Sequence, residues 1–233
     1  DYSQIELRLL AGLSKDPALI DAFKNNKDIH DIAAERIFNV PKSKINKDLR
    51  SKAKMVNYGI AYGLSAFGLS RNLKIPMQEA REIIEQYFEE FESIKNFIDE
   101  TIELAEEKGY SETMLGRKRY IKDINSRNKT VRKMAERIAI NAPLQGLAAD
   151  IIKIAMVNID KILISEKLKS RMILQVHDEL VFEVYKPELN KMLKIVKENM
   201  ENPIDFGVPL EVNMGIGENW MELKKVSKKK KVY

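Results

Sequence analysis

The sequence predicts an α+β fold, with long helices in the first two thirds of the chain and a short antiparallel sheet near its end. Apolar residues recur at helical spacing through most of the first two thirds. Later, the β-rich runs Met172–Val176 and Leu180–Val184 are separated by only three residues, which is typical of a hairpin. The 233 residues are 44% hydrophobic and 32% charged, enough for one core or for two lobes that share one.

The composition excludes several classes of protein and site. Cysteine is absent, which excludes disulfides, thiolate nucleophiles and cysteine-based zinc sites and fits a reducing compartment. No unbroken apolar run approaches the roughly 20 residues of a membrane-spanning helix. We therefore expect no membrane partner, and any metal must be held by oxygen ligands or histidine.

Charge is segregated along the chain. The net charge is +5, but six lysines lie in the last ten residues, where we expect a solvated, disordered tail with weak attraction for polyanions. Two internal segments are basic, with six Lys or Arg in 42–54 and nine in 117–137, whereas segment 79–107 carries eleven acids. This pattern predicts one face for an anion and another for water, although solvated faces alone would also explain it.

The first elements are predicted to be short helices. Ser3 and Glu6 fit a capping box, which would begin a helix at Ser3 and would give Glu6 a sufficient structural role. Further short helices are predicted over Pro17–Phe23 and His30–Phe38. A polar loop would follow them.

The next helix, over Lys47–Ala61, has two chemically different faces. At about 100° per residue, successive fourth residues advance by about 40° around the helix. One face therefore carries Arg50, Lys54, Tyr58 and, if the helix persists, Tyr62, whereas Ala53, Val56 and Ile60 lie on the opposite face. We expect this helix to pack on one side and to offer charge on the other.

The remaining elements alternate between helices and short strands. Residues 77–108 predict one long surface helix or a helix pair, and residues 110–124 a loop with short β structure. Two helices are predicted over 129–141 and 146–164, interrupted at Pro143. A closing helix over 188–201 and a strand over 210–214 complete the prediction.

The tip of the predicted hairpin carries His177, Asp178 and Glu179. An aspartate between apolar strands is costly unless it is solvated or holds a cation. Tight turns also favour aspartate, so ordinary turn chemistry is by itself the better explanation of Asp178 from the sequence. Spacing alone does not pair Asp178 with the acidic residue Asp1.

Three segments resemble, in order, the signature motifs of the bacterial DNA polymerase I family (family A). They are Asp1-Tyr2-Ser3-Gln4-Ile5-Glu6-Leu7-Arg8, Arg50-x-x-x-Lys54-x-x-x-Tyr58-Gly59-x-x-Tyr62-Gly63 and Gln175-Val176-His177-Asp178-Glu179. The similarity extends through Gly116-Arg117-Lys118-Arg119-Tyr120 and Asn141-Ala142-Pro143-Leu144-Gln145-Gly146. It covers essentially the whole chain apart from the lysine tail.

The resemblance implies part of a right-hand polymerase. A helical fingers subdomain and part of an antiparallel palm sheet are expected. The implied boundaries are palm 1–14 with the first catalytic motif, fingers 15–128, palm 129–223 with the second motif, and a lysine-rich tail 224–233.

The implied activity is template-directed transfer of a dNTP to a primer 3′-hydroxyl by two Mg²⁺ ions. Asp1 and Asp178 would bridge the ions, and the Tyr2 carbonyl would add a ligand. Glu179 would lie near the metals or the primer end. Lys54 would act on the triphosphate during the reaction.

The other implied roles concern the nucleotide and the nucleic acid. His30, Arg50 and Lys54 would hold the triphosphate, Tyr58 would stack on sugar and base, Tyr62 would occupy the templating region, and Glu6 would exclude a ribose hydroxyl. Primer and template would be contacted by Arg137, Asn141, Gln145 and His177, and the nucleic-acid backbone by Arg117 and Arg119. Phosphate contacts of this kind hold register without reading sequence.

The expected partners are primer–template DNA, dNTPs and the N-terminal polymerase half that family members carry before the first motif, in the same chain or in a separate subunit. The expected setting is replication and repair at the bacterial nucleoid in the cytoplasm. Activity is expected only in the complete protein. Two alternatives are a single-subunit RNA polymerase and a non-catalytic nucleic-acid-binding part of a split protein.

Overall fold

The computed structural model describes residues 1–226 of the chain, and these fall into two compact units. Unit 1 contains residues 1–5, 148–205 and the chain from 209 onward, and unit 2 contains residues 6–147 and 206–208. The predicted palm segments 1–14 and 129–223 both cross this division, and the names palm and fingers stay predictions.

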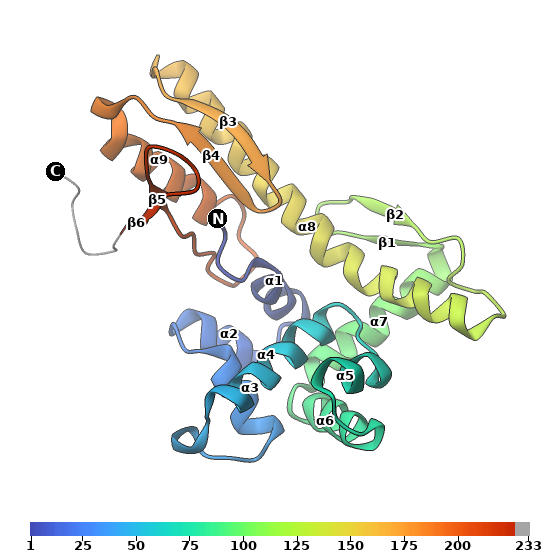
Figure 1. Ribbon diagram of the computed structural model, residues 1–233. Helices are drawn as coiled ribbons and strands as arrows, with labels where there is room; N and C mark the ends of the chain where they lie inside the picture. Colours follow the sequence, from blue (N-terminus) through green and yellow to red (C-terminus); the bar gives the residue numbers. More distant parts are fainter. Residues whose placement is uncertain (227–233) are drawn as a thin grey trace. The chain divides into compact units, whose positions relative to one another are not determined.

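Unit 2 is mostly helical (Figure 1). Its helices are α1 (Ile5–Ser14), α2 (Pro17–Lys24), α3 (Ile29–Ile37), α4 (Lys47–Ala61), α5 (Ala66–Leu73), α6 (Met77–Glu90) and α7 (Glu92–Lys108), followed by strands β1 (Tyr110–Glu112) and β2 (Lys118–Tyr120). A 3₁₀ turn, η1, covers Lys42–Lys44. Helix α3 packs against α4 and α6, and α5 packs against α6.

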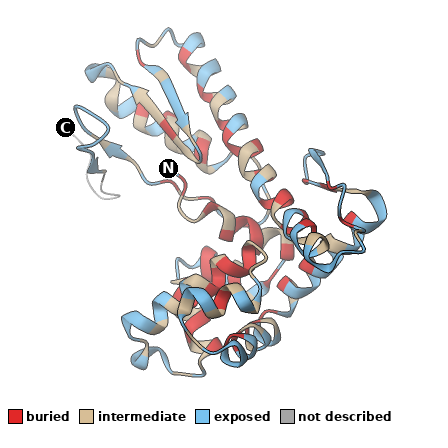
Figure 2. Ribbon diagram, turned by 45° about the vertical axis from the view of Figure 1, so that its right-hand side comes forward, coloured by how far each residue is buried: buried red, intermediate tan, exposed pale blue. Residues whose placement is uncertain are grey.

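Helix α1 is buried on most of its surface (Figure 2). The predicted capping box at its start is wrong: the helix begins at Ile5, and Gln4 has a left-handed backbone with φ of +54°. A capping box would require Gln4 to be the first helical residue. Glu6 is therefore not the third residue of a helix capped by Ser3.

Helix α4 has the two faces that the sequence predicts. Ala53, Val56 and Ile60 are at most 4% exposed, whereas Arg50 and Lys54 are exposed. Asn46 caps the helix, since its Oδ1 accepts the Leu49 amide at 2.9 Å. The cap thus fixes the first turn of the helix that carries Arg50 and Lys54.

The acidic segment forms a helix pair, the second of the two predicted forms. Helix α6 ends at Glu90 and α7 begins at Glu92, on either side of the buried Phe91. Helix α5 was not predicted. Ser65 caps it and Lys74 ends it in a left-handed conformation.

Helix α8 (Lys129–Ser165) is one continuous helix, so the predicted interruption at Pro143 is wrong. Proline has no amide to donate to the carbonyl four residues earlier, which here belongs to Ala139. The Ser111 hydroxyl of β1 donates to that carbonyl at 3.0 Å. A side chain from another element therefore satisfies the acceptor that Pro143 leaves unpaired.

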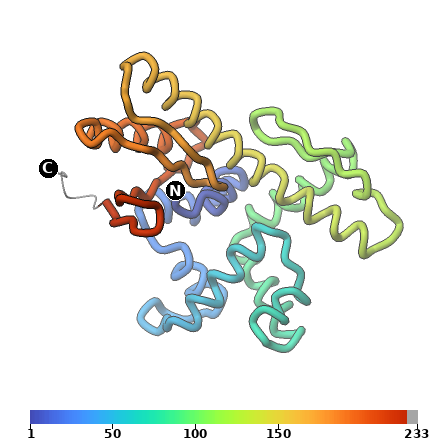
Figure 3. Tube along the Cα trace, turned by 45° about the horizontal axis from the view of Figure 1, so that its top comes forward, coloured from blue at the N-terminus to red at the C-terminus, as the bar shows by residue number. Residues whose placement is uncertain are grey.

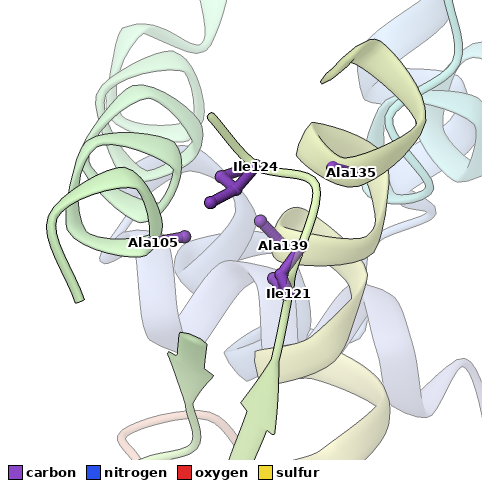
Figure 4. Close-up of a cluster of buried hydrophobic side chains, with 5 residues drawn as sticks. All are labelled: Ala105, Ile121, Ile124, Ala135 and Ala139. Carbon is purple, nitrogen blue, oxygen red and sulfur yellow. The ribbon is translucent and has the colours of Figure 1, made fainter. Parts of the chain in front are cut away.

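The β1–β2 hairpin is held to the first half of α8 by a small apolar cluster (Figure 4). Its members are Ala105 of α7, Ile121 and Ile124 after β2, and Ala135 and Ala139 of α8, all at most 4% exposed. The small alanines let the two helices approach the isoleucines closely. This cluster positions the segment that carries Arg117 and Arg119.

Unit 1 contains the predicted antiparallel hairpin. Strand β3 (Arg171–Val176) pairs with β4 (Glu179–Glu183), with an irregularity between Met172 and Leu174. The unit also contains the second half of α8, the 3₁₀ turn η2 (Lys186–Glu188), α9 (Leu189–Glu201), and β5 (Gly215–Ile216) paired with β6 (Lys224–Lys225). Helices and small antiparallel sheets confirm the predicted α+β class.

The first residues of the chain run beside residues 211–213 (Figure 3). Tyr2 bridges Val212, the Ser3 amide donates to the Glu211 carbonyl at 2.7 Å, and the Asn213 amide donates to the Asp1 carbonyl at 2.8 Å. The strand predicted over 210–214 is present only as this single bridge.

The lysine-rich end begins within the described residues. Lys224 and Lys225 form strand β6, so the prediction of a disordered tail from residue 224 is wrong for these two residues. Lys228–Lys231 lie outside the described residues. Within residues 1–226, none of the helices combines the length and the apolar character needed to cross a membrane.

Shortening Ile124 should destabilise unit 2. Ile124 is 1% exposed, and Ile124→Ala should lower the free energy of unfolding by about 2–5 kcal/mol because it leaves a cavity in the cluster. Urea titration followed by circular dichroism measures the change. Ile164→Ala, at a position that is 69% exposed, is the control and should change stability by no more than about 0.5 kcal/mol. Equal effects of the two substitutions would contradict the cluster's role.

Candidate active site

Unit 1 brings the two acidic segments together at the tip of the β3–β4 hairpin. The Tyr2 amide donates to the Asp178 carbonyl at 3.3 Å. Asp1 is exposed, and Asp178 and Glu179 are half-buried. Backbone pairing thus joins Asp1-Tyr2 to Asp178-Glu179, which spacing alone does not predict.

The Tyr2 carbonyl oxygen points toward the hairpin tip that carries Asp178. In the bridge with Val212, the hydrogen bonds are made by the neighbours of Tyr2 and not by Tyr2 itself. The amide and carbonyl of one strand residue point to the same edge, and this amide donates to Asp178. The carbonyl oxygen of Tyr2 therefore faces the edge on which Asp178 lies.

The hairpin turn consists of two residues, His177 and Asp178, since Val176 pairs with Glu179. His177 is exposed and has a left-handed backbone with φ of +52°. This conformation is uncommon for a residue with a side chain and concentrates at functional sites. It lets the turn present Asp178 next to Tyr2.

Glu179 has a partner that the sequence did not reveal. The indole Nε1 of Trp220, which lies between β5 and β6, donates to Glu179 Oε1 at 2.9 Å. Trp220 is the single tryptophan of the chain and is 48% exposed. The hydrogen bond ties the C-terminal hairpin of unit 1 to the acidic tip.

The oxygen atoms at the hairpin tip are of the kind that binds a hard divalent cation. Asp1 and Asp178 offer carboxylate oxygens and Tyr2 a carbonyl oxygen, the ligands that Mg²⁺ prefers. Among residues 1–226, no lysine or arginine forms an ion pair with Asp1 or Asp178. The described residues include no cluster of three or more His, Cys, Asp or Glu side chains suited to a metal. Any ion here would depend on the two carboxylates, the carbonyl and further oxygen donors.

In unit 2, Arg50 of the cationic α4 face is already paired with acids. Its Nη2 lies 2.6 Å from Asp28 Oδ2, and its Nε lies 3.4 Å from Asp31 Oδ1. Burial opposes ionisation of Asp28, but the hydrogen bonds from Arg50 and from two amides outweigh it, so the pKa of Asp28 lies below its usual range. The same pairing raises the pKa of Arg50.

Asp28 also fixes the start of α3. Its Oδ1 accepts the amides of His30 at 2.8 Å and Asp31 at 3.2 Å, so it is the N-cap of the helix. One carboxylate therefore connects the α3 terminus, where His30 lies, to Arg50 on α4.

His30, in the first turn of α3, is 2% exposed and contacts α4. Its Nδ1 lies 3.1 Å from Asn57 Nδ2, and its ring centroid lies 5.8 Å from that of Tyr58. Burial is the largest cause that lowers the pKa of His30, and Arg50 and Lys54 lower it further, against the opposite effects of Asp28 and Asp31. His30 is therefore neutral at neutral pH.

The end of α4 connects to two other predicted site residues. The Tyr62 hydroxyl donates a short hydrogen bond to Glu6 Oε2, which is the contact that holds Glu6 in place of the predicted capping box. Arg137 Nε donates to the Tyr62 carbonyl at 3.4 Å. Gly63 has φ of +64°, and a Cβ there would come within 3.2 Å of Arg137, so both backbone and space favour glycine.

Of the other predicted nucleic-acid contacts, Arg119 lies on β2, Arg117 directly precedes that strand, and Asn141 and Gln145 lie on α8. Arg117, Arg119 and Gln145 are exposed, and Asn141 is half-buried with an Oδ1 that has no partner among the described residues. Gly146 lies against the β hairpin, because a Cβ there would come 2.5 Å from Thr113 Cγ2. These residues belong to unit 2, as do all predicted triphosphate ligands.

Sequence reasoning missed four residues that hold the predicted ones. They are Asp28 and Asp31, which pair with Arg50, Asn57, which contacts His30, and Trp220, which contacts Glu179. A buried polar residue such as Asn57 on the apolar face of a helix is a signal that could have been used. No comparable signal links Trp220 to Glu179.

The family model described as DNA polymerase family A matches residues 1–222. "DNA polymerase I" of Mycobacterium leprae (strain TN) is 48% identical over 220 residues, which cover 94% of this chain and 24% of that protein. "DNA polymerase I" of Streptococcus pneumoniae (strain ATCC BAA-255 / R6) is 50% identical over 225 residues, covering 96% of this chain and 26% of that protein. The chain thus spans about a quarter of the length of these curated relatives.

A solved structure is also similar. It is described as "POL domain of Pol1 from M. smegmatis complex with DNA primer-template and dNTP", with a TM-score of 0.90 and 47% sequence identity. The match covers 94% of this chain and 39% of that chain.

Removing the acceptor from Trp220 should change its fluorescence. Glu179→Ala should increase quenching of Trp220 by acrylamide, because the indole loses a hydrogen bond worth about 0.5–1.5 kcal/mol. Glu179→Gln keeps an acceptor oxygen and should have a smaller effect. Glu183→Ala, at an exposed position of the same strand, is the control. Unchanged quenching in Glu179→Ala would mean that the contact does not hold Trp220.

Proposed function

Because the chain belongs to DNA polymerase family A, we propose that it forms the catalytic and nucleotide-binding part of a template-directed DNA polymerase. The predicted family resemblance is confirmed by the match over residues 1–222. The polymerase activity, its dNTP and primer–template substrates and the roles of individual residues belong to the proposal. The observation that carries it is the hydrogen bond from the Tyr2 amide to the Asp178 carbonyl, which joins the first and last motifs.

The proposed metal ligands are the carboxylates of Asp1 and Asp178 and the backbone carbonyl of Tyr2. These oxygens would hold the Mg²⁺ ions, which supply charge stabilisation of the attacking and leaving oxygens in nucleotidyl transfer. Glu179, restrained by Trp220, would lie next to the two principal carboxylates. A negative cluster of this kind would disfavour a phosphate unless cations were present.

The triphosphate would be held by donors from α3 and α4. Arg50 and Lys54 project from the exposed face of α4, and His30 lies beside them. Arg50 would exchange its exposed contacts with Asp28 and Asp31 for phosphate oxygens. Exposed ion pairs contribute only about 0–1 kcal/mol, so a multiply charged phosphate can compete with them.

Tyr58, Tyr62 and Glu6 would form the sugar and base side of the same site. The hydrogen bond from Tyr62 to Glu6 supports a shared role, because it fixes the glutamate that would exclude a ribose hydroxyl. Tyr58 would stack on the nucleotide. Arg137, Asn141, Gln145 and His177 would contact primer and template, and Arg117 and Arg119 the backbone.

The rival RNA polymerase reading has less support, since each relative named above is a DNA polymerase I. The reading as a non-catalytic part of a split protein makes the opposite prediction about catalysis. Substitution of the principal carboxylates therefore distinguishes it.

The proposed role of Asp178 is tested in a chimaera in which residues 1–222 replace the matching segment of the M. smegmatis POL domain. Asp178→Ala should lower the rate of single-nucleotide addition by about 10³-fold or more, because the lost interaction is made in the transition state. Primer–template affinity should stay within a few fold. Rapid-quench primer extension and a fluorescence titration measure the two quantities.

The control is Glu183→Ala, which removes a carboxylate from the same hairpin. It should leave both quantities unchanged. A chimaera with Asp178→Ala that retains the rate of the unsubstituted chimaera would overturn the carboxylate assignment.

A further inference from the structure

We propose that Asn57 is a positioning residue that holds His30 in the neutral tautomer with its proton on Nε2, so that this N–H donates to a triphosphate oxygen. The tautomer follows from contacts within unit 2. The identity of the acceptor rests on the proposed function.

Asn57 lies on the packed side of α4 and is 2% exposed. Its Nδ2 lies 3.1 Å from His30 Nδ1 and 3.4 Å from the Ile29 carbonyl oxygen. A carbonyl oxygen can only accept a hydrogen bond, so the Ile29 contact identifies this end of the amide as NH₂. His30 Nδ1 must then accept from Asn57 and carries no proton.

The flipped amide is less favourable. It would bring Asn57 Oδ1 against the Ile29 carbonyl, which is a contact between two acceptors. It would also move the two N–H donors to the position where Oδ1 now lies, and that atom has no hydrogen-bond partner among the described residues. The observed orientation leaves only the acceptor Oδ1 of Asn57 without a hydrogen bond. The flipped amide would leave its N–H donors without partners and would also bring two acceptor oxygens into contact.

The charged groups around His30 agree with a neutral ring. Asp28 and Asp31 on α3 favour the protonated form, while burial and the cations Arg50 and Lys54 on α4 disfavour it. The net effect lowers the pKa of His30 below its usual value, so the ring is neutral at neutral pH. With Nδ1 used as an acceptor, the proton of the neutral ring is on Nε2.

A fixed N–H donor suits a phosphate ligand. Phosphate oxygens are acceptors only, and the other tautomer would present a lone pair at Nε2 and repel them. His30 would then bind in the same form across the neutral pH range, because it does not need to take up a proton. Asn57 fixes this form, because its hydrogen bond to Nδ1 requires that nitrogen to carry no proton.

Nitrogen-15 NMR of the histidine rings tests the tautomer directly. The chain has only two histidines, and the exposed His177 is an internal reference. At pH 7.5 we expect His30 to show a protonated Nε2 and an unprotonated Nδ1. A His30 ring that is protonated on Nδ1, or on both nitrogens, would overturn the proposal without any variant.

The informative variant is Asn57→Asp, which replaces the donor by a carboxylate. His30 should then carry a proton on Nδ1, and the pKa of His30 should rise by about 1 unit or more, because an opposite charge within hydrogen-bond distance favours imidazolium. The matched control is Asn46→Asp, which adds the same charge to α4 while keeping an N-cap. The control should leave the His30 tautomer unchanged, and an unchanged His30 in Asn57→Asp would contradict the proposal.

The acceptor is tested by adding inorganic tripolyphosphate to the unsubstituted chain. The Nε2 resonance of His30 should shift, because its N–H enters a hydrogen bond with a phosphate oxygen. A shift confined to lysine and arginine signals would remove His30 from the phosphate site and overturn that half of the proposal. Failure of polymerisation by the chimaera, with the His30 shift intact, would count against the proposed function alone.

Discussion

The pairing of residues 1–3 with the second half of unit 1 is the constraint on which the candidate site depends. Residues 1–3 lie along 211–213, and the same strand donates the Tyr2 amide to Asp178. Because Tyr2 occupies a position at which its neighbours make the bonds to the facing segment, its own amide and carbonyl are turned toward the hairpin tip. A shift of one residue would turn them away and would direct Asp1 to the opposite face.

The cationic part of the proposed site is held by a different kind of interaction. Asp28 uses one oxygen to cap α3 and the other to bind Arg50, so helix capping and the orientation of the guanidinium depend on one side chain. Asn57 holds the His30 ring from the packed face of the same helix. Both faces of α4 therefore contribute: the exposed face carries the cations, and the buried face carries the residue that orients their neighbour.

Much of the fold could be predicted from the sequence, whereas the candidate site residues come from the resemblance to family A and stay a prediction. Helical spacing gives the bounds of α4 and its two faces, because burial follows the same period. The helix at Pro143 was predicted wrongly because the Ser111 hydroxyl, distant in sequence, satisfies the freed carbonyl. The capping box failed for a similar reason, since the tertiary contact with Tyr62 holds Glu6. Contacts between distant segments also explain why Asp28, Asn57 and Trp220 were missed.

The most direct test of the account asks whether a hard cation binds beside Trp220. Tb³⁺ prefers oxygen ligands and emits when an adjacent indole is excited, and the chain's one tryptophan contacts Glu179. The account predicts indole-sensitised emission that Mg²⁺ suppresses by competition and that Asp1→Asn or Asp178→Asn abolishes, while Glu89→Gln on the acidic α6 leaves it unchanged. Sensitised emission that survives both substitutions, or that is absent from the unsubstituted chain, would contradict a cation site formed by these two carboxylates.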